Sequence, residues 1–588
     1  MTDLRVGHFL LQERSGNVSF KEIPLIGNEH SEETRNIINL IVQVINNRGI
    51  EILSESSFLT WLDENGVKHQ GEWDDTKEYD RLSVVLHEGN SYTSVKSVPV
   101  GIDILNDEFW VLTGNYNAQI ENHREEIERV NKKLDEKSDI IYVDDELNER
   151  FINIKSLGAE NNTDVTTILK QAIEMATLNS KGVYVPKGDF NITEMNILDN
   201  VELYGSGTLN LIGNSEQPVQ IQKNVIINGI NFIGNKLTQD IKQIFMKIKG
   251  TNVKIINCMF KDFYDKIIYF DRNSDYGTVS RCTFKDNGIV DNCNAISILS
   301  SFTKVQDNIF LNHGNGHSIR TGYFDGDNPF DVTNIIINNN FMSELDHNGI
   351  TIENGSKYIS VLNNHIENAP QAIKAEKTIN NVEFITVKNN YMNNISLVTA
   401  FNLLGTDNCI VEGNTLMNSG GGLSVGDYGI MNNNKVINCI NGLTARRNTI
   451  ITNNIIQDCT GRPVNVYSGL VSGNEVINCK PNDNRVLMNV GETSDSHGIS
   501  IIGNVFINPI EHVGASNSCI SFLGKNIVCS NNVLTDSSHN MEYGVYVKSN
   551  SKGYIIKDNI MNTKNKIVYG ATVDDKNIVK DNVEIRPV

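Results

Sequence analysis

The stretch that decides the fold of this chain runs from Asn432 to Cys479 and reads NNNKVINCINGLTARRNTIITNNIIQDCTGRPVNVYSGLVSGNEVINC. Two residue types return in it every twenty positions, namely Asn434, Asn454 and Asn474, and Cys439, Cys459 and Cys479. No helical period explains an interval of twenty, whereas apolar and polar residues alternate locally, as in GLTAR. Short strands, Asn and Gly turns and a period in the twenties indicate a solenoid of stacked β-coils.

The same motif extends through most of the C-terminal part of the chain, at intervals mostly of 20 to 32 residues. Its first position is occupied by Cys258, Cys282, Asn308, Asn340, Asn364, Asn390, Asn414, Asn434, Asn454, Asn474, Asn504, Asn532 and Asn559. We expect the amides to form a ladder between coils about 4.8 Å apart, with the cysteines as an apolar column beneath it. The nine cysteines form no CxxC pair, which favours buried thiols over disulfides or zinc ligands.

Composition narrows the classes of function. The chain has 588 residues, enough for several domains, and a net charge of -20. This charge disfavours nucleic acid and anionic membranes as partners of the surface as a whole. No apolar run approaches the roughly 20 residues of a membrane span, so no membrane insertion is expected. The N-terminus lacks the pattern of a secretion signal, which predicts a protein that leaves the cytoplasm only by lysis or within a particle.

Before the solenoid, residues 66–114 contain short β-rich runs separated by turn signals, with Trp73, Tyr92 and Trp110 spread among them. This segment resembles the small carbohydrate-binding modules of chitinases and phage tail appendages. The resemblance implies that the three aromatic residues bind sugar. The alternative is that they form the only core that a module of this size can have.

Two further regions flank this module. Residues 1–65 are mixed in character, and we interpret them as the region that attaches the chain to a larger assembly. Residues 115–140 place Ile120, Ile127 and Leu134 seven positions apart, which predicts a short coiled-coil stalk. The alternative for the stalk is a lone solvated helix.

Residues 151–209 carry a second resemblance, with Gly158-Ala159, then Asp164 at a helix start, a helix through Ala176, and a strand around Pro186 and Gly188. This order resembles the opening segment of pectate-lyase-like parallel β-helix proteins. It implies that residues 141–588 form a right-handed parallel β-helix whose first helix covers the open end of the strand stack. Asp164 is expected to cap that helix. The predicted fold class is therefore mainly β.

Candidate functional residues lie where the coils lengthen, because loops on a rigid scaffold commonly carry function. The longest interval, from Asn308 to Asn340, contains the loop YFDGDNPFD with Asp325 and Asp327. Alignment of successive strands by their apolar alternation defines two outward columns. One holds Ser297, Arg320, Thr351, Lys374 and Asn402, and the other holds Leu299, Gly322, Glu353, Glu376 and Leu404.

Two carboxylates on adjacent coils can share a site, and repulsion between them raises one pKa and leaves a proton for acid catalysis. We therefore predict four catalytic residues: Glu353, Glu376, Asp346 and His317. The predicted substrate-binding residues are Arg320, Lys374, His347, Asp291, Asp325 and Asp327, together with Trp73, Tyr92 and Trp110 of the small module. The alternative is a solvated lattice of salt bridges on an outward face.

These groups suit two kinds of chemistry. Glycoside hydrolysis needs two carboxylates, about 5 Å apart for retention or about 6.5–9.5 Å for inversion. Phosphodiester cleavage could use the same carboxylates and His317, with Arg320 and Lys374 neutralising charge on phosphorus. Pectate lyases of this fold bind calcium through aspartates on a strand face. No Asp-x-Asp stands on a predicted strand here, so we expect no metal and no cofactor.

The order of adaptor, aromatic module, stalk and capped β-helix resembles bacteriophage tail appendages and tailspikes, especially preneck or collar appendages. The resemblance implies a homotrimer in the virion that is attached to tail or collar proteins through its N-terminus. It implies an enzyme that binds and depolymerises a host cell-surface glycopolymer, either wall teichoic acid or a capsular polysaccharide or exopolysaccharide. A non-catalytic adhesin of the same fold is the alternative, and a bacterial polysaccharide lyase is a third interpretation.

Overall fold

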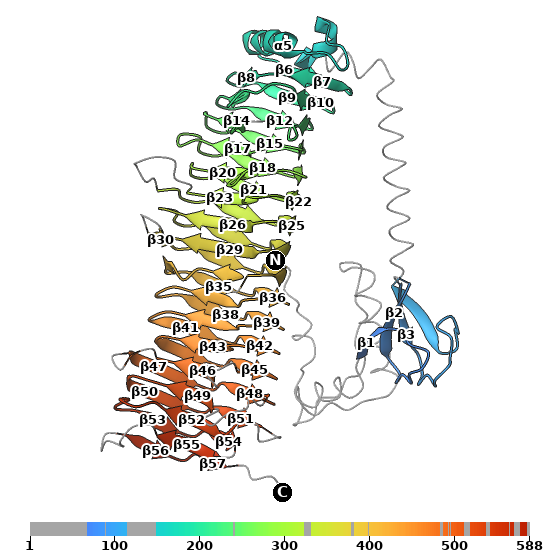
Figure 1. Ribbon diagram of the computed structural model, residues 1–588. Helices are drawn as coiled ribbons and strands as arrows, with labels where there is room; N and C mark the ends of the chain where they lie inside the picture. The colour runs from blue at the N-terminus through green and yellow to red at the C-terminus, as the bar shows by residue number, and fades with distance from the viewer. Residues whose placement is uncertain are drawn as a thin grey trace, which may run out of the picture. The chain divides into compact units, whose positions relative to one another are not determined.

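The computed structural model describes residues 68–114 and 149–584, apart from residues 89, 239–240, 323–330, 378–380, 398, 482–485, 492, 494–495, 511–517, 537–540, 564 and 570–576. Contacts within the chain divide it into two units, Met1–Asp145 and Glu146–Val588 (Figure 1). The predicted attachment region and coiled-coil stalk lie outside the described residues. Among the described residues, no helix is long and apolar enough to cross a membrane.

The described part of the first unit is a small four-stranded sheet. Its strands are β1 (Lys68–Glu72), β2 (Ser83–His87), β3 (Asn90–Ser94) and β4 (Trp110–Gly114), in that spatial order. β1 pairs with β2 in parallel, and the other pairs are antiparallel. Tyr79, Val85, Val98, Ile104 and Trp110 form a core separate from that of the second unit. Of the three aromatic residues expected to bind sugar, Trp110 belongs to this core, whereas Trp73 and Tyr92 pack against it partly exposed.

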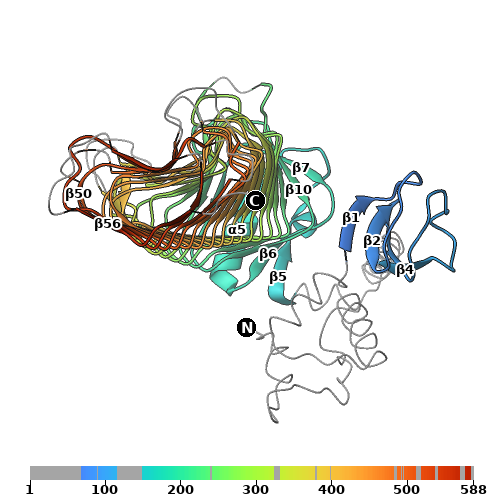
Figure 2. The ribbon, with the colours of Figure 1, turned by 90° about the horizontal axis from the view of Figure 1, so that it is seen from below.

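The second unit is a right-handed parallel β-helix, as predicted, and each turn of chain, or rung, contributes one strand to each of three faces. Viewed along its axis, the rungs superimpose and their corners line up (Figure 2). Face one contains β8 (Met195–Ile197), β11 (Val219–Ile221), β14 (Ile244–Ile248), β17 (Lys266–Phe270), β20 (Ile296–Ile298), β23 (Ile319–Thr321), β26 (Asn348–Glu353), β29 (Gln371–Glu376), β33 (Phe401–Asn402), β37 (Leu423–Val425), β40 (Leu443–Ala445), β43 (Val464–Val466), β46 (Val486–Val490), β49 (Ser518–Phe522), β52 (Tyr543–Val547) and β55 (Asn565–Tyr569).

Face two follows face one in each rung. It contains β5 (Phe151–Asn153), β6 (Gly182–Val185), β9 (Glu202–Gly205), β12 (Ile226–Asn228), β15 (Lys254–Ile256), β18 (Thr278–Ser280), β21 (Lys304–Gln306), β24 (Ile336–Asn338), β27 (Ser360–Leu362), β31 (Thr386–Lys388), β35 (Ile410–Glu412), β38 (Ile430–Asn432), β41 (Thr449–Thr452), β44 (Gly469–Ser472), β47 (His497–Ile502), β50 (Lys525–Ser530), β53 (Ile555–Lys557) and β56 (Ile578–Lys580). The short strands β30 (Val382–Glu383) and β34 (Thr406–Asp407) pair just before this face.

Face three closes each rung. It contains β7 (Asp189–Ile192), β10 (Thr208–Leu211), β13 (Asn231–Ile233), β16 (Met259–Lys261), β19 (Thr283–Lys285), β22 (Ile309–His313), β25 (Phe341–Leu345), β28 (His365–Ala369), β32 (Tyr391–Ile395), β36 (Thr415–Met417), β39 (Lys435–Ile437), β42 (Ile455–Gln457), β45 (Glu475–Ile477), β48 (Val505–Ile507), β51 (Val533–Thr535), β54 (Ile560–Asn562) and β57 (Val583–Glu584). Inward side chains from all three faces fill one continuous apolar core.

A helix covers the first rungs. After the 3-10 turn η1 (Ile154–Leu157), α5 (Thr166–Asn179) buries Leu169, Ala172, Ile173 and Ala176 against the strands. The Asp164 carboxylate accepts a hydrogen bond from the backbone N–H of Thr166 at 2.9 Å, although the N-cap position itself is Val165. The helix shields strand edges that would otherwise pair with another chain.

The predicted asparagine ladder is confirmed, and it continues to Asn582. From Asn308 onward, each buried Nδ2 donates to the Oδ1 of the equivalent residue in the next rung, at 2.8–3.0 Å. All nine cysteines are free and buried, as predicted. The column of Cys439, Cys459 and Cys479 lies at the next corner, after face three, rather than beneath the amides.

Candidate functional site

The site is built on face one, where the strand register matches the predicted columns. Arg320 lies opposite Ser297 on one side and Thr351 on the other, and Thr351 lies opposite Lys374. Glu353 lies opposite Glu376 in the neighbouring column. Because inward positions between them are filled by residues such as Ile350 and Ile352, these side chains share the outward side of the sheet.

Arg320 and Glu353 form an ion pair that is about nine-tenths buried. The Arg320 Nη2 and Nε atoms lie 2.7 and 3.0 Å from the same oxygen, Oε2 of Glu353. The third contact joins Arg320 Nη1 to Asn292 Oδ1 at 3.1 Å. The side chains are only 11% and 9% exposed, so water screens their attraction weakly. The structure thus fixes both groups in one geometry.

Glu376 has a cation of its own, the Nζ of Lys374, which contacts its Oε2. This pair is more open than the first, because the side chain of Glu376 is 47% exposed. Glu353 and Glu376 thus lie opposite each other in the register, as predicted, and each is held by its own cation. A proton shared between them stays a prediction.

His317 lies beside these ion pairs in a hydrogen-bonded chain. Asn348 Nδ2 donates to Thr351 Oγ1 at 3.1 Å, and the same oxygen lies 3.1 Å from His317 Nδ1. The Nδ1 atom of His347 lies 3.2 Å from the same nitrogen. The ring of His317 is therefore held between Thr351 and His347.

The protonation of His317 differs from that expected of a catalytic acid. Burial lowers the pKa of His317 to about 2, and the charge of Arg320 adds to this effect. The imidazole is thus neutral at ordinary pH, which corrects its predicted role as an acid and leaves it as a hydrogen-bonding group. Burial also lowers the pKa of His347, and Lys374 and Arg320 lower it further against the opposing charge of Asp291.

The remaining predicted residues are placed as follows. Asp291 is exposed and close enough to His347 to act on it electrostatically. Asp346 is also exposed, and its backbone N–H donates to the His313 carbonyl oxygen at 3.0 Å. Asp325 and Asp327 lie outside the described residues.

In the small module, the three aromatic residues differ in exposure. Trp73 and Tyr92 are half-buried against the core. Trp110 is 3% exposed and stacks edge-on against Tyr79, with ring centroids 5.3 Å apart. The assignment of Trp110 to sugar binding is therefore wrong, because its ring is part of the core.

Sequence reasoning missed three contributors to the site. Asn292 and Asn348 anchor Arg320 and Thr351, but nothing distinguishes them from the many other asparagines of the repeat. His313 is buried, with Nε2 2.6 Å from the Cys293 carbonyl oxygen. Burial lowers the pKa of His313 to about 4.

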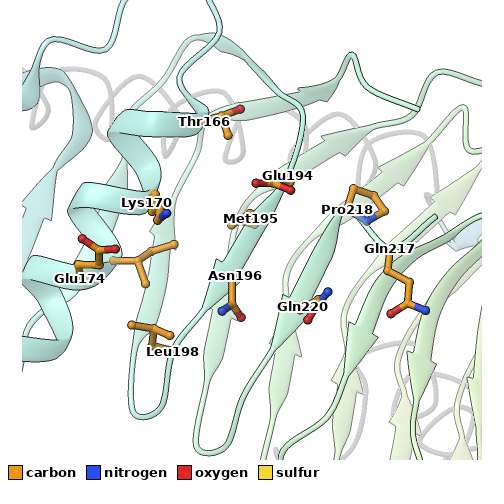
Figure 3. A pocket seen from close by; sticks show the side chains of 11 residues that line it. Thr166, Lys170, Glu174, Glu194, Met195, Asn196, Leu198, Gln217, Pro218 and Gln220 are labelled. Carbon is orange, nitrogen blue, oxygen red and sulfur yellow. The ribbon is translucent and has the colours of Figure 1, made fainter. Parts of the chain in front are cut away.

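The outward column of Arg320 continues toward the N-terminal end of face one. Strand register carries it through Ser297, Tyr269, Lys247, Gln220 and Asn196. Its last two members line a cavity of about 280 Å³ between α5 and the first rungs, together with Lys170, Glu174 and Glu194 (Figure 3). Among the described residues, no group of three or more His, Cys, Asp or Glu side chains is arranged to hold a metal ion.

Comparison with known proteins relates the chain to others by fold alone. No protein-family model matches it, and neither does any curated protein. The Streptococcus pneumoniae surface protein and adhesin PfbA is 14% identical, with 63% of this chain and 99% of that chain covered and a TM-score of 0.41. A mutant tailspike protein of E. coli bacteriophage HK620 is 12% identical, covering 73% and 79%, with a TM-score of 0.43.

A third similar structure is the catalytic unit of the GH87 α-1,3-glucanase from Streptomyces thermodiastaticus. It is 15% identical, with 73% of this chain and 70% of that chain covered and a TM-score of 0.36. Likenesses this weak carry no functional argument, so the function has to be inferred from the chain's own side chains.

Proposed function

We propose that this chain is a carbohydrate-active enzyme, a bacteriophage tail appendage that binds and depolymerises a host cell-surface glycopolymer. The observation that supports it is the pair of ion pairs on adjacent rungs of face one, Arg320 with Glu353 and Lys374 with Glu376. Two carboxylates on neighbouring rungs of a rigid sheet suit hydrolysis of a glycosidic bond. Arg320 and Lys374 could also contact a polymer that carries negative charge, such as teichoic acid or an acidic capsule, when its anions replace their carboxylate partners.

The two carboxylates have different surroundings and are assigned different roles. Glu353 is buried and held by Arg320, which favours a charged carboxylate acting as base or nucleophile. Glu376 is more exposed, so a substrate can reach it, and we assign it to the leaving-group side of the bond. His317, held between Thr351 and His347, positions the substrate by hydrogen bonding.

Digestion of purified polymers tests this proposal. We expect the protein to shorten one member of a panel of wall teichoic acids, capsules and exopolysaccharides. Glu353→Gln should reduce the rate at least a hundredfold. Glu412→Gln is the matched control, because Glu412 forms a similar ion pair with Lys388 on face two. Intact polymer in every reaction, or full activity in Glu353→Gln, would contradict the proposal.

A non-catalytic adhesin of the same fold is the second candidate. One observation favours it: both carboxylates are already engaged by cations, as in an electrostatic binding surface. In that case the double variant Glu353→Gln and Glu376→Gln still adsorbs to host cells. Neither this variant nor the wild type releases a cleavage product.

The virion location and the homotrimer are parts of the same proposal. They are supported by the resemblance of the segment order to tail appendages, and they predict a particle of three times 65.6 kDa in light scattering. A variant that lacks residues 1–65 should still form a trimer, whose mass is smaller only by the three deleted segments. The same variant should no longer be incorporated into phage particles. A monomeric full chain would contradict the trimer.

A further inference from the structure

The corner between face one and face two is built in an unusual way. One residue at this corner has a positive φ in each of eleven successive rungs. In six rungs it is asparagine: Asn200, Asn224, Asn252, Asn334, Asn408 and Asn448. In the other five it is aromatic: Tyr276, Phe302, Tyr358, Phe384 and Tyr428, with φ between 57° and 63°. We call these five residues the corner row.

The left-handed backbone conformation is unfavourable for the aromatic residues of the corner row, and burial of their side chains does not offset this cost. Asparagine tolerates the left-handed conformation, whereas a bulky side chain there is an outlier. The rings are nevertheless exposed, from 40% for Phe384 to 58% for Tyr428. Strained residues persist where the fold or its function requires them, and these rings contribute little to the core. We therefore looked for a role outside the molecule.

Four of the rings form two stacked pairs along the helix axis, which we call platforms, and one face of each ring is turned toward its partner in the pair. Tyr276 and Phe302 stack with centroids 4.9 Å apart and planes 12° apart, and Tyr358 and Phe384 stack at 5.0 Å and 5°. Asn334 separates the two platforms by one rung, so their centres lie three rungs, or about 14 Å, apart. A chain-like ligand running along the axis would meet them in succession.

Acidic residues stand beside three of the five rings, whereas Lys357, which forms an ion pair with Asp331, directly precedes Tyr358. Asp275, Glu383 and Asp427 directly precede three of its rings in sequence, and Asp407 precedes the intervening Asn408. Glu383 lies opposite Asp407 in the pairing of β30 with β34, and burial and the charges of Asp427 and Glu383 raise the pKa of Asp407. The carboxyl groups clustered near Phe384 and Tyr428 repel an anionic polymer and repel a second copy of this surface. They accept hydrogen bonds from hydroxyl groups.

We propose that the corner row is a second glycan-binding surface, which holds an uncharged polysaccharide segment against its ring faces. Sugar rings present an apolar face that packs on an aromatic ring and a rim of hydroxyl groups that carboxylates accept. The inference rests on the proposed function in one respect, since it assumes that the chain acts on glycans. It assigns them a separate surface, at the corner between faces one and two rather than on the outward side of face one. Both surfaces share rungs, because Tyr358 follows Glu353 by five residues.

The Tyr358→Asn and Phe384→Asn double variant tests the proposal, because asparagine is the residue that neighbouring rungs place at this corner. We expect the temperature of unfolding to stay equal or rise. Binding of uncharged hexasaccharides (chitohexaose, cellohexaose and maltohexaose), measured by titration calorimetry, should weaken at least tenfold for those that bind the wild type. Tyr391→Thr on face three is the matched control, since Thr415 occupies the equivalent position one rung on.

Three outcomes would overturn the inference. A lower unfolding temperature with unchanged affinity would make the rings structural. A change in sedimentation would make the row an interface between copies of the chain. If the wild type bound none of the uncharged hexasaccharides, the proposed ligand would be ruled out. Cleavage of a polymer without corner binding overturns this inference alone, whereas corner binding without cleavage overturns only the proposed enzyme.

Discussion

At the scale of single residues, the site depends on charges that are out of water. The Arg320 and Glu353 side chains neutralise each other at 2.7 Å with little exposure. Separating such a pair leaves an uncompensated buried charge, which is far more destabilising than losing a surface pair. The pair therefore matters for stability as well as for any chemistry at Glu353.

Arg320→Ala should lower the free energy of unfolding by about 3–5 kcal/mol, because the Glu353 carboxylate is left buried without its cation. Urea denaturation measures this change. Lys388→Ala breaks the exposed pair with Glu412 and should change it by less than about 1 kcal/mol. Equal effects of the two substitutions would show that the buried pair is no stronger than a surface pair.

His317 makes stability depend on pH. Its pKa is lowered to about 2 in the folded chain, so between there and about 6.5 the unfolded chain binds the extra proton. The part of the folding stability that depends on a neutral His317 is complete above pH 6.5 and is lost as the pH falls. From pH 7.5 to pH 5 we expect the wild type to lose about 2 kcal/mol through this group. His317→Asn should remove that loss of stability. His365→Gln, on the exposed side of face three, is the control and should show the same loss as the wild type. Urea unfolding at pH 7.5 and at pH 5 measures both.

At the scale of elements, the asparagine ladder holds one rung to the next. Asn454 donates to two carbonyl oxygens and to Asn474 Oδ1, and its own Oδ1 accepts from Asn434. These bonds satisfy backbone groups at a corner where the strands end and no sheet partner is available. Its neighbour Asn453 instead provides the left-handed turn, with φ of 56°.

Asn454→Ala should lower the free energy of unfolding by about 2–4 kcal/mol, because buried carbonyl and amide groups lose their partners. Asn453→Gly is the control and should be close to neutral, since Gly413 and Gly473 occupy the same corner in other rungs. Thermal denaturation compares the two. If Asn453→Gly lost as much stability as Asn454→Ala, the buried ladder amides would stabilise the fold no more than the neighbouring turn residues do.

At the scale of the whole molecule, each described unit has its own core. The core of the β-helix runs without interruption from Ile154 to Met561, and that of the small module contains Val85 and Trp110. We therefore expect residues 146–588 alone to unfold cooperatively at the urea midpoint of the full chain's β-helix, followed by circular dichroism. A fragment that also lacks α5 should aggregate, because the first strand edges are uncovered. A non-cooperative 146–588 fragment would contradict this independence.

Much of the fold and part of the site follow from the sequence. The interval of the asparagines predicts the rungs, and strict alternation predicts that Glu353 lies opposite Glu376, because a one-residue slip would turn every apolar side chain outward. The pairing of Arg320 with Glu353 was not predicted. It runs diagonally between two columns, and alternation says nothing about diagonal neighbours.

The sequence by itself determined which residues point inward, which rungs neighbour each other and where the ladder runs, because these properties depend on local alternation and spacing. Only the tertiary structure decided how exposed each outward group is and which partner it finds. His317 became neutral and Trp110 became core, whereas Tyr358 and Phe384 stayed exposed. Exposure and pairing depend on side chains from rungs some twenty to thirty residues away, whose packing no local pattern encodes.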